Sequence, residues 1–174
     1  MKWVLIIVGI VVGLVALVAA IGALLPKSHV AARAAKFKQS PQTIWDTITD
    51  IAAVPCWRPE VQSVEKLPDR NGHPVWVEIS KMGRLPYEIT VYDPPKRFVT
   101  TIADDTLPFG GNWTYEISEA EGGSILTITE NGEIYNPFFR FMARFIFGYH
   151  TTLEAYLKNL GKKFGEKIII INPS

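Results

Sequence analysis

The stretch 137-PFFRFMARFIFGYHTTLEAYLKNLGKKF-164 decides the fold, because the rest of the chain has to bury its apolar side. Large apolar residues recur in it at steps of three and four, the spacing of one amphipathic helix face. Asn136 and Pro137 suit the start of this helix, and Gly165 suits its end. The apolar side fills a protein core or roofs a cavity for an apolar ligand, and the helix alone does not separate the two. It carries Phe138, Met142, Phe145, Tyr149, Leu153, Tyr156, Leu160 and Phe164.

Composition limits the classes of protein to which the chain can belong. Its 174 residues suit one domain with a small appendage. Eighteen basic residues against 17 acidic ones provide no basic surface for nucleic acid. A single cysteine, Cys56, and three scattered histidines provide neither a disulfide nor the spacing of metal ligands. We therefore expect no nucleic acid, metal or cofactor.

The first segment has the composition of a membrane span. Residues 3–25 carry no charge and, at about 1.5 Å per residue, are long enough to cross about 30 Å of hydrocarbon. The alternative is a cleaved signal peptide, with Lys2 as its basic start and Ala16–Ala20 as its small residues, but the apolar run continues beyond the usual core of such peptides. Basic residues follow the span and favour a cytoplasmic domain. They are Lys27, Arg33, Lys36 and Lys38.

The remainder predicts an α+β domain. Residues 29–39 alternate as a first strand, Ser40 caps a short helix over 41–50, and the prolines of 54–62 indicate a tight connection. Six β-rich runs separated by short turns then predict antiparallel neighbours. We expect about seven strands wrapped around the last helix, with domain boundaries at 1–28, 29–167 and 168–174. The six runs are 63–67, 74–81, 85–92, 97–103, 111–119 and 124–133.

Alternation within these runs predicts which side chains face the helix. Trp76 and Glu78 fall on the opposite face and are expected outside. The isoleucine tail 168–171 has no assigned place; it could add an edge strand, pack under the helix or contact lipid. The expected inner face contains Val75, Val77, Ile79, Tyr87, Ile89, Val91, Trp113, Tyr115, Ile117, Leu126 and Ile128.

The order of these elements, with three local motifs, resembles the START, polyketide-cyclase and Bet v 1-like superfamily, also called SRPBCC. The motifs are 93-DPPKR-97, 111-GNWTYEI-117 and 136-NPFFRF-141. The resemblance covers residues 29–164 and implies a helix-grip fold, in which a curved sheet and a long helix enclose a cavity. It also implies binding of lipids, sterols, polyketides or other apolar molecules, which some members cyclise, dehydrate or hydroxylate.

Glu130 is the one residue of chemical interest, because it continues the inward series of Leu126 and Ile128. A carboxylate inside must be paired, since an unpaired charge is expensive to bury. It is a candidate general acid or base, or else an ion-pair partner of Arg140 or Arg144. The residues expected to contact a ligand are Trp57, Tyr87, Ile89, Trp113, Tyr115, Ile128, Glu130, Met142, Phe145 and Tyr149.

The beginning of the last helix is more apolar than one buried face requires. Aromatic rings alternate there with arginines, a composition suited to a lipid surface. We expect Phe139, Arg140, Phe141 and Arg144 to contact the membrane. The sequence thus predicts a membrane-anchored protein that binds a hydrophobic small molecule for carriage or sensing. Two alternatives stay open: a cyclase or dehydratase that uses Glu130, and an interaction module whose cavity is filled by its own side chains.

Overall fold

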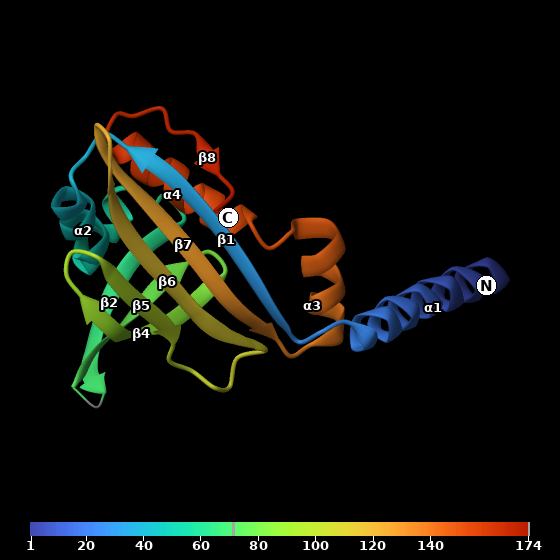
Figure 1. The fold of residues 1–174 in the computed structure, drawn as a ribbon. Coiled ribbons are helices and arrows are strands. Elements are labelled where there is room, and N and C mark those ends of the chain that lie inside the picture. Colours follow the sequence, from blue (N-terminus) through green and yellow to red (C-terminus); the bar gives the residue numbers. More distant parts are fainter. Residues whose placement is uncertain (71, 174) are drawn as a thin grey trace.

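The computed structural model describes residues 1–70 and 72–173. Asn71, between the predicted strands 63–67 and 74–81, and Ser174 of the tail lie outside the described residues. The chain forms an antiparallel sheet in the order β2-β3-β4-β5-β6-β7-β1-β8, curved around α4 (Figure 1). The predicted α+β helix-grip fold is confirmed. The strands are β1 Ser28–Phe37, β2 Val61–Arg70, β3 His73–Ser80, β4 Gly83–Asp93, β5 Arg97–Ile102, β6 Phe109–Ala120, β7 Gly123–Ile134 and β8 Ile170–Ile171.

The helices begin where the sequence provides caps. The Ser40 side chain accepts a hydrogen bond from the Thr43 amide at the start of α2, and the Asn136 side chain accepts from the amides of Phe138 and Phe139. Each cap satisfies amides that lack a partner within the helix. The helical elements are α1 Lys2–Leu24, α2 Pro41–Thr49, the 3₁₀ turn η1 Ile51–Cys56, α3 Pro137–Met142, the π-helical turn η2 Ala143–Phe147 and α4 Thr151–Lys163.

The last helix is interrupted, whereas the sequence predicted one continuous element. Gly148 has φ 73° and ψ 159°, a backbone conformation that is open to glycine and strained for other residues. The apolar spacing continues across this position, so periodicity alone could not show the break. As a result, α4 stays against the sheet while α3 turns away and packs on α1 (Figure 1).

The predicted inner face is correct on β6 and β7 and wrong on β3. Trp76 and Glu78, expected outside, are buried, and Trp76 stacks on Tyr87 of β4 with 5.5 Å between ring centroids. Val75 and Val77 are buried as well, on the other face of the sheet, so β3 is apolar on both sides and its alternation was misleading. On β4 a bulge between Ile89 and Val91 reverses the alternation, which leaves Val91 exposed.

The main core lies where α2 and α4 pack on the sheet. Its fully buried members include Phe37, Ile44, Ile48, Leu126, Leu157 and Leu160. The isoleucine tail closes the sheet beside this core, because Ile170 and Ile171 pair with Ala35 and Ala34 of β1. Of the three possibilities left open for the tail, the structure shows the edge strand.

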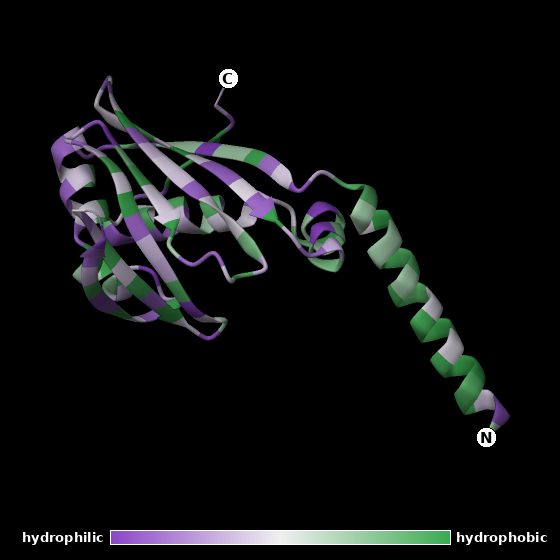
Figure 2. Cartoon of the chain, turned by 90° about the horizontal axis from the view of Figure 1, so that it is seen from below, coloured by the Kyte–Doolittle hydropathy of each residue, from purple (hydrophilic) through white to green (hydrophobic). Residues whose placement is uncertain are grey.

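Helix α1 stands apart from the rest of the molecule and is apolar along nearly its whole length (Figure 2). It is long and apolar enough to cross a membrane. Only its C-terminal end meets the domain, where Gly22 is buried against Pro137 and Arg140 of α3 donates to the carbonyl oxygen of Leu25 at 2.8 Å.

Candidate ligand-binding site

The space between the concave face of the sheet and the segment from α3 to α4 brings together most of the predicted ligand contacts. Strands β4, β6 and β7 contribute neighbouring side chains, since Tyr87 lies 5.8 Å from Trp113 between ring centroids and Trp113 pairs in register with Glu130. Tyr149, just before α4, lies against the same region and is half-buried. The candidate site therefore lies beside the point where α3 leaves the sheet.

Glu130 is held by three side chains. Its carboxylate accepts from Trp113 Nε1 at 3.1 Å, lies 3.2 Å from His29 Nε2, and accepts from Thr152 Oγ1 at 3.5 Å. The sequence suggested Arg140 or Arg144 as the ion-pair partner of Glu130, but the residue beside its carboxylate is His29. Both members of the pair retain a small exposed surface, 11% for the His29 side chain and 14% for that of Glu130. The carboxylate is thus fixed in place and still accessible at the wall of the site.

Gly132 makes this arrangement possible. It pairs in register with His29, and a Cβ at position 132 would collide with the imidazole ring and approach the Glu130 carboxylate. The imidazole has little freedom to move aside, because it stacks on Tyr149 with 4.0 Å between centroids. The absence of a side chain at 132 leaves room for the imidazole ring beside β7.

A second polar cluster lies deeper in the site. Arg58 donates to Glu78 and to Glu60, both at 2.9 Å, and its guanidinium lies 5.3 Å from the centre of the Tyr156 ring. Burial raises the pKa of Glu78, and the nearby Arg58 offsets only part of this rise. Burial would lower the pKa of Arg58, but Glu78, Tyr156 and Glu60 outweigh it and raise the pKa. The two groups thus satisfy each other inside the domain.

Three tyrosines surround these clusters as neutral hydroxyls. Burial raises the pKa of Tyr115 to about 12 and raises those of Tyr87 and Tyr156 well above 10. Tyr115 and Tyr156 are almost fully buried, whereas Tyr87 is half-buried. The protein's own side chains therefore cover the Tyr87 ring less completely than those of Tyr115 and Tyr156.

Aromatic packing closes the other end of this space, toward α2. Tyr115 stacks on Phe98 at 4.3 Å and meets Tyr156 at 5.4 Å, and Trp57 contacts Tyr156 edge-on at 5.1 Å. Protein side chains therefore fill the α2 end of the interior. Tyr87, Trp113 and Glu130, farther from α2, are half-buried and form the candidate site.

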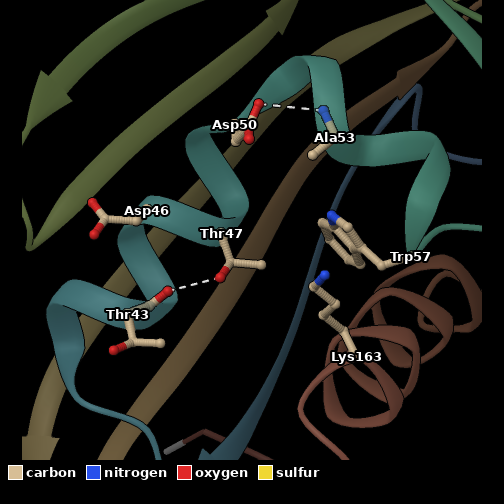
Figure 3. Close-up of a pocket in the computed structure, with 7 residues that line it drawn as sticks. All are labelled: Thr43, Asp46, Thr47, Asp50, Ala53, Trp57 and Lys163. Carbon is tan, nitrogen blue, oxygen red and sulfur yellow. Dashed lines mark hydrogen bonds between the residues drawn. The ribbon is translucent and has the colours of Figure 1, made fainter.

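Two surface pockets border the domain. One of about 310 Å³ lies between α2, η1 and α4, and Trp57 and Lys163 form part of its wall (Figure 3). Trp57, predicted to line the internal site, thus separates the core from this outer pocket, and its buried indole Nε1 has no partner among the described residues. A second pocket, of about 240 Å³, lies at the ends of β1, β6 and β7, next to His29.

Two expected contacts are placed elsewhere. Phe145, predicted to line the site, is 56% exposed on η2. Arg140, predicted to meet lipid, is buried and binds the end of α1, because its position on α3 faces that helix. Of the other expected membrane residues, Phe139 and Arg144 are exposed and Phe141 is half-buried against Phe145.

Three residues of the site were not anticipated from the sequence: His29, Arg58 and Glu78. The register of β1 on β7 brings His29 to Glu130 across 101 positions of sequence, and Arg58 reaches inward from the connection before β2. The sequence feature that could have predicted the second cluster is the pair of opposite charges, Arg58 and Glu78, within otherwise apolar surroundings. The alternation along the strand predicted instead that Glu78 lies outside.

Comparison with known proteins agrees with this architecture. The profile of the family described as "Polyketide cyclase / dehydrase and lipid transport" matches residues 29–165. Among curated proteins, no sequence matches the chain.

Solved structures show the same fold at low sequence identity. A START superfamily protein from Mycobacterium smegmatis is 20% identical with a TM-score of 0.60, covering 78% of this chain and 96% of its own. A conserved protein from Geobacillus kaustophilus is 13% identical with a TM-score of 0.63, covering 80% and 97%. The di-domain ARO/CYC StfQ from the steffimycin biosynthetic pathway is 9% identical with a TM-score of 0.60, covering 76% and 48%. The chain therefore belongs to the polyketide cyclase / dehydrase and lipid transport family.

Proposed function

We propose that this protein binds a hydrophobic small molecule or lipid between the concave sheet and the segment from α3 to α4. The observation that supports this most directly is that Tyr87, whose ring contacts Trp113 across the sheet, is only half-buried. Half-buried Trp113 and Tyr149 border the same space. Large half-buried rings provide the apolar contact area that such ligands need.

The polar groups of the site favour a ligand with a small polar end. Arg58 and Glu78 satisfy each other, so a ligand gains little from contacting them. Glu130 and Tyr87 both lie beside Trp113 in the candidate site, and their polar groups can accept or donate one or two hydrogen bonds. A mostly apolar body with one hydroxyl or carbonyl group matches this distribution.

Helix α1 supports a function at a membrane. Its length and composition suit a single span, and the basic residues after it favour a domain on the cytoplasmic side. Because such a span keeps the domain beside the bilayer, the protein would carry or sense its apolar ligand there.

Native mass spectrometry of the full chain, extracted from its host in mild detergent, tests the proposal. We expect one apolar molecule bound per chain. Tyr87→Ala should lower the occupancy at least about tenfold, the factor that corresponds to about 1.4 kcal/mol. Tyr92→Ala is the matched control, because Tyr92 lies on the same strand but packs on Trp45 outside the candidate site. Equal occupancy in both variants, or an empty wild-type protein, would contradict binding at this position.

The variant Glu130→Gln separates binding from catalysis. The neighbouring imidazole of His29 makes Glu130 a candidate proton-transfer group, and such a group contributes about 10²-fold or more to a rate. If the protein only binds its ligand, the Glu130→Gln variant retains a molecule of unchanged mass. If Glu130 were a general acid or base, the variant would carry the unreacted substrate, and the mass of the bound molecule would change.

A further inference from the structure

The end of α1 and the beginning of α3 are fastened to each other. Gly22 lies so close to Pro137 that any side chain at position 22 would collide with the Pro137 carbonyl oxygen. The buried guanidinium of Arg140 donates to the carbonyl oxygens of Leu25 at 2.8 Å and Tyr135 at 3.4 Å. Arg140 thus caps the C-terminal end of α1 with a residue from a distant part of the sequence. The two helices form one joint.

This joint determines where α3 lies relative to a membrane. If α1 spans the bilayer, its last turn emerges at the boundary between acyl chains and headgroups, since its length matches the hydrocarbon thickness. Figures 1 and 2 show α3 beside this end of α1 and running across its axis. The segment from α3 to η2 therefore lies along the surface of the bilayer.

The same segment carries a cluster of exposed apolar side chains. Five large ones are between 38% and 64% exposed: Phe138, Phe139, Phe145, Ile146 and Phe147. Arg144 is exposed beside them and takes part in none of the ion pairs among the described residues. Water is a poor environment for such a cluster, and a monomeric domain seldom leaves one uncovered. Rings that enter the interface, with a guanidinium among the phosphates, match a bilayer surface.

We propose that the exposed side chains of this segment form a docking surface for a phospholipid bilayer, next to the candidate ligand-binding site. They are Phe138, Phe139, Arg144, Phe145, Ile146 and Phe147. Tyr149 follows this segment directly in the sequence and stacks on His29. Docking of the segment therefore brings both residues close to the membrane. An apolar molecule can then pass between the bilayer and the site with little exposure to water. This inference rests on the membrane anchor of the proposed function, and it does not depend on the identity of the ligand.

Fluorescence quenching in vesicles tests the docking surface. The full chain, with Cys56→Ser to remove its one cysteine, is placed in phosphatidylcholine and phosphatidylglycerol vesicles. A cysteine introduced as Phe147→Cys or Ile146→Cys carries an environment-sensitive fluorophore, and lipids spin-labelled near the headgroup act as quenchers. The matched control is Asp69→Cys, at the exposed end of β2, on the side of the domain away from α1 (Figure 1).

We expect the labels at 146 and 147 to lose fluorescence and the label at 69 to keep it. Serine at both 139 and 145, combined with the label at 146, should abolish the loss while α1 stays in the membrane. Unquenched labels at 146 and 147, in a protein that resists alkaline extraction, would overturn the docking surface and leave the anchor standing. Extraction of the protein at high pH would refute the anchor and the docking surface together. The ligand occupancy measured by native mass spectrometry tests the binding site independently of the docking surface.

Discussion

At the scale of single residues, Gly132 is the position on which the polar part of the site depends. A methyl group there would meet the imidazole of His29, which stacks on Tyr149. We expect Gly132→Ala to lower the free energy of unfolding by about 1–3 kcal/mol, the range for a strained buried contact. Urea unfolding of the full chain in mild detergent, followed by circular dichroism, measures this change.

A double-mutant cycle shows whether the imidazole is the cause. In a His29→Ala background the methyl group has room, so most of the penalty of Gly132→Ala should disappear. An unchanged penalty in that background would mean that position 132 requires glycine for a reason unrelated to His29.

At the scale of elements, the break at Gly148 determines whether the last helix roofs the sheet along its whole length. Alanine at 148 separates the two possibilities by the sign of its effect. With φ 73° and ψ 159°, alanine should destabilise by about 1–3 kcal/mol. In a continuous helix it would stabilise by about 1 kcal/mol, because alanine favours helix over glycine.

The same unfolding assay measures the effect of Gly148→Ala. Ala155→Gly, at an exposed position inside α4, is the control, because it should cost about 1 kcal/mol whichever backbone Gly148 adopts. If Gly148→Ala stabilised the protein instead, the result would contradict the break and support the continuous helix that the sequence predicted.

Sequence patterns predicted the elements well where one physical signal dominated. Caps and turn residues placed α2, the start of α3 and six of the strands, because these signals are local. They failed on β3, where valines on one face and a tryptophan with a paired carboxylate on the other are all buried. They also failed at Gly148, since the conformation of one glycine depends on what α3 packs against. The partnership of His29 with Glu130 arises from strand register, which no local pattern encodes.

At the scale of the whole molecule, the contact between α1 and α3 joins the long apolar helix to the domain. Gly22→Val should separate the two helices, because its side chain would collide with Pro137. We expect faster hydrogen–deuterium exchange over residues 137–147 in this variant, measured by mass spectrometry on the full chain in detergent. Gly13→Val is the matched control, since nothing lies within 4 Å of a Cβ at position 13. Equal exchange in the two variants would contradict the joint.

The connection between α1 and β1 is only three residues long, 25–27. The backbone carbonyl oxygen of Lys27 also accepts a hydrogen bond from the amide of Ile134 at 2.9 Å. Three extended residues reach about 10 Å, so a domain anchored by α1 cannot leave the neighbourhood of its own leaflet. Such a protein cannot shuttle cargo between distant organelles or across a wide aqueous compartment. If α1 spans a membrane and the domain delivers a ligand, delivery has to occur within that short radius, to a neighbour in the same membrane or to a partner that comes to it.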